Sequence, residues 1–232
     1  MNKILSHSLK YLGVCLILAG SFFFARCVAA YTSAQSKNKE FTIVVDAGHG
    51  GADPGKVGID NLLEKDLNLS IALKVAKLFE KKGYNVILTR KDDSDLADED
   101  SVKRKSDDLK NRITLIEDSN ADLTVCIHQN SFPDESVHGP QVFYYSDSED
   151  SKELATIVQN EIDESLEVDK SRGIKSNSDY YLLKKSPTPT IIVECGFLSN
   201  PTEAQLLSDD SYQEKLARAI YIGIYNYIKR CS

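Results

Sequence analysis

Three short apolar runs, each followed closely by a polar side chain able to bind a metal or a proton, restrict the possible fold most. The runs are residues 41–46 (FTIVVD), 122–128 (DLTVCIH) and 190–194 (TIIVE). Short runs rich in β-branched residues predict strands that are buried on both faces. Strands of this kind occur in mostly parallel sheets covered by helices, so the runs predict an α/β fold.

Segments with helical periodicity alternate with the strands. We expect helices at 64–82, 108–118, 151–165 and 211–229, and further strands at 84–90 and 141–145. Segment 91–107 is strongly charged, and we expect it to be a solvated, mobile loop because it lacks calcium-binding spacing. The pattern predicts a single α/β domain, with a twisted, mostly parallel sheet and helices on both faces.

The first 30 residues predict export. Lys3 and Lys10 precede an apolar run from Tyr11 to Ala25, and Arg26 and small residues follow it. The run is shorter than the roughly 18 to 20 residues of a typical membrane span. We expect a signal peptide at 1–30, with an uncleaved membrane tether through residues 9–26 as the alternative. A polar linker at 31–40 then leads to a catalytic domain at 41–230.

Charge excludes one class of partner. The chain has a formal net charge of −7, and residues 31–232 carry 25 Lys and Arg against 35 Asp and Glu. An acidic domain is repelled by phosphate backbones, so we expect no nucleic-acid partner. By the same argument it would gain little from an anionic membrane surface. Cys126 and Cys195 lie in apolar runs, which predicts buried free thiols rather than a disulfide framework.

Four polar residues are expected to meet at one edge of the sheet. His49 follows the first strand, His128 ends a second, Glu194 ends a third, and Glu64 begins the first helix. Sites in α/β sheets form beyond the carboxyl ends of the strands. Two imidazoles and a carboxylate are a catalytic zinc set, and a second carboxylate can act as a base. Glycines around His49 would allow the sharp bend and leave room for substrate.

Each of these residues also has a structural alternative. A histidine at a strand end is often a surface residue, and Glu64 would be a favourable charge at a helix N-terminus. Glu194 is harder to explain structurally, because a carboxylate closing an apolar strand needs a partner. The spacings are long, so the pattern alone leaves the choice between a zinc hydrolase and scattered polar residues open.

Several separated motifs, taken in order, resemble one enzyme family. VVDAGHGGADPG at 44–55, a helix-opening Glu64, ADLTVCIHQN at 121–130 and IIVECGFLSNP at 191–201 are similar to the zinc-dependent N-acetylmuramoyl-L-alanine amidases of the Amidase_3 family. The resemblance covers about residues 41–229. It departs at Gln129, where a small residue is common, and at Ala47, where proline is common, and neither position is a ligand.

The resemblance assigns roles to individual residues. It implies one zinc ion per chain, with His49, Glu64 and His128 as ligands and Glu194 as the catalytic residue. It makes Asn130 and Arg112 candidates for contacts with the substrate or with the metal ligands. Arg90 and Arg112 also match family positions, and Arg112 is expected to hold structure more than to touch substrate. The implied reaction is hydrolysis of the amide between N-acetylmuramic acid and L-alanine of the peptidoglycan stem peptide.

Within the family, the short chain resembles the germination-specific amidases of spore formers. These act on spore-cortex peptidoglycan in muramic-δ-lactam formation, and some depend on a protein partner. The resemblance thus implies an activating partner and an exported enzyme of the cell envelope, in the forespore intermembrane space. The alternatives are a vegetative autolysin or cell-separation amidase, a non-catalytic peptidoglycan-binding module, and another zinc hydrolase such as a carboxypeptidase or deacetylase.

Overall fold

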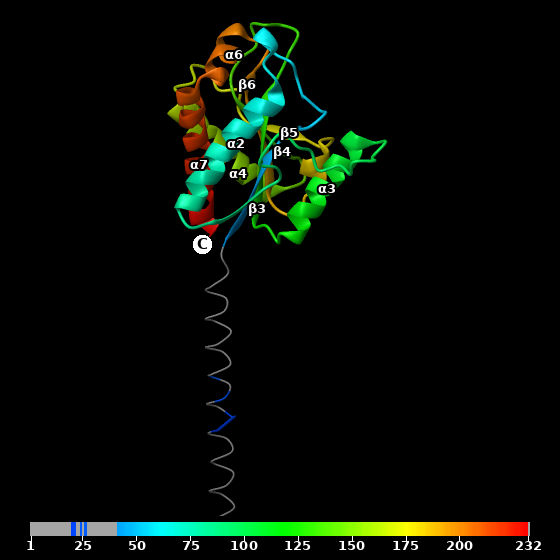
Figure 1. Ribbon diagram of the computed structural model, residues 1–232. Helices are drawn as coiled ribbons and strands as arrows, with labels where there is room; N and C mark the ends of the chain where they lie inside the picture. The colour runs from blue at the N-terminus through cyan, green and yellow to red at the C-terminus, as the bar shows by residue number, and fades with distance from the viewer. Residues whose placement is uncertain (1–19, 22–23, 25, 27–40, 232) are drawn as a thin grey trace, which may run out of the picture. The chain divides into compact units, whose positions relative to one another are not determined.

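The protein is described by a computed structural model that covers residues 20, 21, 24, 26 and 41–231 (Figure 1). The chain divides into two units, residues 1–40 and 41–232. Among the described residues no helix is both long and apolar enough to cross a membrane. The predicted export segment falls almost wholly outside the described residues, so signal peptide, tether and linker remain predictions.

The second unit is built on a six-stranded sheet. Its strand order is β2-β1-β3-β6-β4-β5, and every neighbouring pair is parallel except β4 and β6. The strands are β1 (Thr42–Ala47), β2 (Asn85–Leu88), β3 (Leu123–Asn130), β4 (Gln141–Tyr145), β5 (Lys175–Asn177) and β6 (Thr190–Phe197). The predicted mostly parallel α/β sheet is confirmed.

Helices cover both faces of the sheet (Figure 1). One face packs against α2 (Glu64–Lys81), α4 (Glu149–Ser165) and α7 (Asp210–Cys231), and α6 (Pro201–Ser208) precedes α7. The other face packs against α3 (Arg104–Asp118) and α5 (Tyr181–Lys185). Strand alternation explains this arrangement, because Ile43 and Val45 of β1 belong to the first core and Val44 belongs to the second.

The ends of the strands differ from the sequence prediction. β3 continues two residues beyond His128, and β6 continues three residues beyond Glu194. The pairing of these two strands shifts register between His128 and Asn130. Such an irregularity re-aims side chains at the end of a strand, and here it falls beside the cleft described below.

Segment 91–107 is held by contacts that the loop prediction did not include. Its last four residues begin α3, and Arg104 pairs with Asp95 at 2.7 Å. The carboxylate of Asp108 accepts a hydrogen bond from the backbone N–H of Leu96 at 2.8 Å. Because its charged side chains form ion pairs and hydrogen bonds within the segment and with α3, these contacts hold the segment in place. Cys126 and Cys195 are fully buried free thiols, as predicted.

Candidate active site

Three of the predicted residues form a compact group of potential metal ligands. His49, Glu64 and His128 each offer one ligand atom, and these atoms all lie within 4.8 Å of one another. Glu64 Oε1 lies 3.2 Å from His49 Nε2 and 2.9 Å from His128 Nδ1. The two imidazole rings stand edge to face, with centroids 5.1 Å apart. Two nitrogen donors and one carboxylate thus face a common point and could bind a metal ion.

Burial and backbone hydrogen bonds hold the carboxylate of Glu64 in place. It is 2% exposed and accepts hydrogen bonds from the backbone N–H groups of Lys56 at 2.8 Å and Gln129 at 3.1 Å. Burial opposes its ionisation, but hydrogen bonds and charge from His128 and His49 outweigh burial and hold its pKa well below its usual range. The group therefore stays ionised, which is the form that binds metals.

Glycines make room for the ligands rather than for substrate alone. A Cβ atom at Gly48 would lie 2.2 Å from Cε1 of His128. At Gly55, where φ is +68°, it would lie 2.6 Å from Glu64 Oε2 and 2.7 Å from His49 Cδ2. The glycine-rich sequence thus allows the loop to approach both other ligands closely.

Glu194 lies beside the ligand group, on the neighbouring strand. It is the register partner of His128 across β3 and β6 and is 7% exposed. Burial raises the pKa of Glu194 to about 7, although the nearby His128 opposes the rise. Its Oε2 atom is buried and has no hydrogen-bond partner among the described residues. A free carboxylate oxygen with a pKa near neutrality suits an acid–base group.

These residues line one cleft of about 330 Å³. His49, Glu64, His128, Glu194 and Asn130 all contribute to its wall, so the structure brings together five of the six predicted site residues. Other lining side chains include Lys56, Lys105, Leu109, Tyr180, Tyr181 and Ile192. The wall combines apolar surface with a few convergent polar groups, which is typical of a binding site.

Arg112 does not line this cleft. It is 1% exposed and lies behind the loop that carries His49, where it pairs with Asp46 at 2.5 Å and Asp108 at 2.8 Å. Its guanidinium also donates to the carbonyl oxygens of Ala47 at 2.9 Å and His49 at 2.7 Å. These contacts place its guanidinium against the backbone of the ligand loop, and its predicted role stays a prediction. His138 is also outside the cleft, in an exposed loop.

Two residues near His49 were not predicted as site residues. Asp53 Oδ2 lies 2.8 Å from His49 Nδ1, which leaves His49 Nε2 directed at Glu64. Lys105 Nζ lies 3.2 Å from the same Asp53 oxygen. The signal for Asp53 was its place four residues after a candidate ligand. No local pattern identifies Lys105, because α3 brings it to the loop from far along the chain.

Fold and site define a class, the α/β proteins with a candidate metal site at the carboxyl edge of a mostly parallel sheet. The chain belongs to the N-acetylmuramoyl-L-alanine amidase family, which it matches over residues 43–226. The family assignment stated from the motifs is therefore confirmed.

Two individual amidases are similar to this chain. The chain is 41% identical over 188 residues to the germination-specific N-acetylmuramoyl-L-alanine amidase of Bacillus subtilis (strain 168), covering 80% of this chain and 78% of the relative. It is 31% identical to N-acetylmuramoyl-L-alanine amidase LytC of the same strain, covering 81% of this chain but 36% of LytC.

A solved structure gives the same picture. The CwlD amidase of Clostridioides difficile, determined in complex with the GerS lipoprotein, is 46% identical and superposes with a TM-score of 0.79. The match covers 82% of this chain and 99% of that chain.

Proposed function

We propose that this chain is a zinc-dependent peptidoglycan hydrolase that cleaves the amide between N-acetylmuramic acid and L-alanine of the stem peptide. The observation that carries the proposal is the free, buried Oε2 atom of Glu194 in the same cleft as the His49, Glu64 and His128 group. Membership of the amidase family supports the substrate and the bond.

The residues present fit a zinc ion. Zinc favours imidazole nitrogen and carboxylate oxygen donors, and catalytic sites commonly use three protein ligands. His49, Glu64 and His128 would hold the ion, and the hydrogen bond that the second nitrogen of His49 donates to Asp53 is the outer contact such histidines usually have. Zinc supplies a Lewis acid that polarises a carbonyl group and makes a water molecule more acidic.

Glu194 would carry out the proton transfers. Its unpaired oxygen accepts the proton of the attacking water and then donates it to the nitrogen of L-alanine as that amine leaves. The mixed apolar and polar walls of the cleft hold the glycan and peptide on either side of the amide. Asn130, at the end of β3, is a candidate for hydrogen bonding to the substrate.

The catalytic role is tested by Glu194→Gln in the full-length protein loaded with zinc. We expect hydrolysis of purified muropeptides to fall about 10²- to 10⁴-fold, because the acid–base group is lost. Bound zinc, measured by elemental analysis, should stay near one per chain, because Glu194 is not among the three ligands. Product analysis by mass spectrometry should show stem peptides with a free L-alanine amine.

The alternatives predict different outcomes of that assay. A deacetylase would release acetate, a carboxypeptidase would shorten the stem, and a binding module would retain muropeptide without product. Full activity in Glu194→Gln would overturn the assigned role. The matched metal control is His128→Ala, which should lose both zinc and activity because one of three ligands is removed.

We further propose a role in spore-cortex modification needed for germination. The germination-specific relative is 41% identical to this chain and LytC is 31% identical, which favours this role over that of a vegetative autolysin. The enzyme would act outside the cytoplasm, in the forespore intermembrane space. The complex of the C. difficile relative with a lipoprotein supports a protein partner, whose role we propose is activation. Cortex from spores lacking this protein should lack muramic δ-lactam, and an unaltered cortex would favour the vegetative role.

A further inference from the structure

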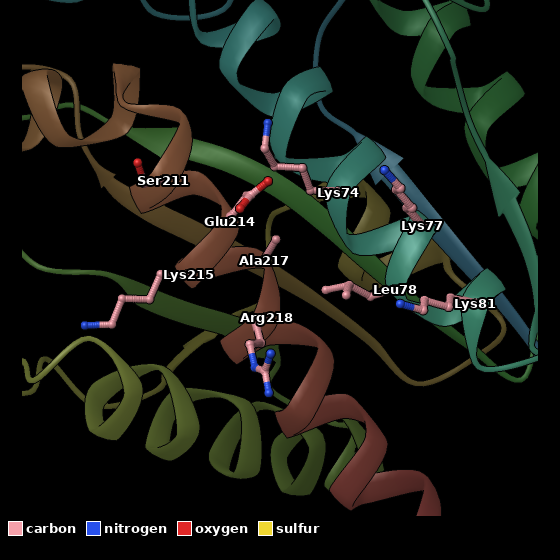
Figure 2. A pocket seen from close by; sticks show the side chains of 9 residues that line it. All are labelled: Lys74, Lys77, Leu78, Lys81, Ser211, Glu214, Lys215, Ala217 and Arg218. Atoms are coloured by element: carbon pink, nitrogen blue, oxygen red, sulfur yellow. The ribbon is translucent and has the colours of Figure 1, made fainter.

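The acidic domain gathers basic side chains on one helical surface. Residues 41–232 carry 23 Lys and Arg against 34 Asp and Glu. A hollow of about 450 Å³ nevertheless lies between α2 and α7 with cations on both of its sides (Figure 2). We call the hollow and the adjoining helix ends the basic face, whose cations are Lys74, Lys77, Lys81, Lys82, Lys215, Arg218 and Lys229.

Most of these charges are not neutralised. Lys74 pairs with Asp210 at 2.7 Å. Within residues 41–231, the other four cations of the hollow form no ion pair. Lys82 and Lys229 each place Nζ 5.6 Å from the ring centroid of Tyr225, a contact that leaves their charge in place.

Few carboxylates accompany the basic face. Glu214 lines the hollow and projects from α7 toward α2 in Figure 2. Asp210 is the partner of Lys74, and Glu80 precedes Lys81 on α2. Counted on α2 from Lys74 onward and on α7, these seven cations stand beside three carboxylates, and the acidic residues of the neighbouring α4, among them Glu161, lie beyond α7. An anionic partner is the one that this surface attracts.

The basic face runs along α2 from Lys74, and its Lys81 and Lys82 part lies at the end of the domain where the chain enters. The ring of Tyr84, just after α2, contacts the ring of Phe41, the first residue of the domain, at 6.1 Å between centroids. Lys81 ends α2, whereas Glu64 begins it in the cleft. Seventeen residues of helix separate them by about 26 Å. A polymer bound in the cleft would have to turn around the domain to reach Lys81.

We propose that the basic face contacts an anionic phospholipid membrane. Linker residues 31–40 span at most about 35 Å, and they join Phe41 to a segment containing the apolar run Tyr11–Ala25. A membrane attachment combined with a basic surface binds more stably than either alone. The net charge predicts little affinity for such a surface, but the distribution of charge leaves this face free to approach. The inference does not depend on the amidase activity.

The contact can be measured on residues 41–232 alone. Among the described residues, both hydrophobic cores are built from positions 41 onward. In addition, 82% of this chain matches 99% of the solved chain of the C. difficile relative, so the domain is a complete folding unit. Without the N-terminal segment, vesicle binding reports the domain surface only.

The test is co-sedimentation of this domain with vesicles of phosphatidylcholine, with and without phosphatidylglycerol. We expect binding only to the anionic vesicles and its loss at high salt, because surface charges are screened. The triple variant Lys77→Gln, Lys81→Gln, Arg218→Gln should bind at least about ten-fold more weakly. A matched control removes three exposed cations elsewhere, Lys103→Gln, Lys184→Gln and Lys185→Gln, and should bind like the wild type.

Other results would overturn the proposal. Equal binding to neutral and anionic vesicles, no binding to either, or equal losses in both triple variants would each contradict it. So would tight binding of soluble polyphosphate without vesicle binding, which would assign the face to an anionic polymer. All three proteins should cleave muropeptide at the same rate. A lack of product from all three would count against the proposed amidase activity and leave the vesicle result standing.

Discussion

Individual residues near His49 decide how well the candidate metal site is organised. Asp53 accepts from one imidazole nitrogen and thereby directs the other toward Glu64. Its carboxylate also accepts from the backbone N–H of Gly55 at 3.2 Å, so the turn and the ligand share one anchor. Burial opposes ionisation of Asp53, but the hydrogen bond and charge of His49 lower its pKa. It is therefore a charged positioning residue at neutral pH.

Asp53→Asn should weaken zinc binding about 10- to 100-fold, because the amide orients the imidazole less strongly than a carboxylate does. Isothermal titration with zinc measures the effect, and thermal unfolding of the metal-free protein should change little because Asp53 is partly exposed. Asp134→Asn, in an exposed loop, is the control. Unchanged zinc affinity in Asp53→Asn would remove the positioning role.

Gly48 leaves no space for a side chain beside the ring of His128. Gly48→Ala would force its Cβ against the His128 ring, at a separation that no relaxed structure allows. We expect the ring to be displaced and zinc binding to be lost even if the domain stays folded. Zinc content beside the circular dichroism spectrum separates loss of the site from loss of the fold. Normal zinc content in a folded variant would show that the loop can yield.

At the scale of elements, two arginines join the strand edge to its neighbours. Arg112 of α3 and Arg90 after β2 both donate to the carbonyl oxygen of Ala47, at the end of β1. Arg90 also donates to the carbonyl oxygen of Gly48, and Arg112 to that of His49. Arg112 and Arg90 thereby hold the ligand loop from behind, and neither of them lines the cleft.

Arg112→Met should destabilise the domain by about 3 to 5 kcal/mol, because it leaves Asp46 buried without its cation. Burial favours protonation of Asp46, and Arg112 outweighs burial and keeps its pKa below the usual value. The stabilisation is thus present above about pH 4 and is lost as pH falls through the lower folded pKa. Denaturant unfolding of the variant and the wild type at pH 7 and at pH 3 measures the loss of unfolding free energy at each pH. An equal loss at the two pH values would contradict this account.

Burial also decided which helices and strands could be predicted from the sequence. The apolar strands and long amphipathic helices were predicted because burial fixes their periodicity. β5 and α5 were not predicted. Lys175–Asn177 is short and polar, and Tyr181–Lys185 is a helix of only five residues. The rule that sites form at strand ends predicted His49, His128 and Glu194. It did not predict Lys105, whose place depends on how α3 packs, nor the strand order.

As a whole, the domain at residues 41–231 has two distinct ends. The cleft lies at the carboxyl edge of the parallel strands. The chain enters at the opposite edge, where Phe41 contacts Tyr84, and α7 runs beside α2 toward that same edge. Its last described residue, Cys231, is exposed, whereas Cys126 and Cys195 are fully buried. Residues 41–231 therefore present one exposed thiol, at the end of α7 away from the cleft.

This polarity makes the domain suited to oriented attachment on a solid support. Coupling of residues 41–232 to maleimide beads through Cys231 should leave the cleft pointing outward, so that even insoluble wall fragments are digested. Moving the handle, by Phe132→Cys in a Cys231→Ser background, places it next to the cleft-lining Ser131. That preparation should still cleave small muropeptides yet lose most of its action on whole walls. Domains coupled to a bead through Cys231 would thus all present their clefts to the wall.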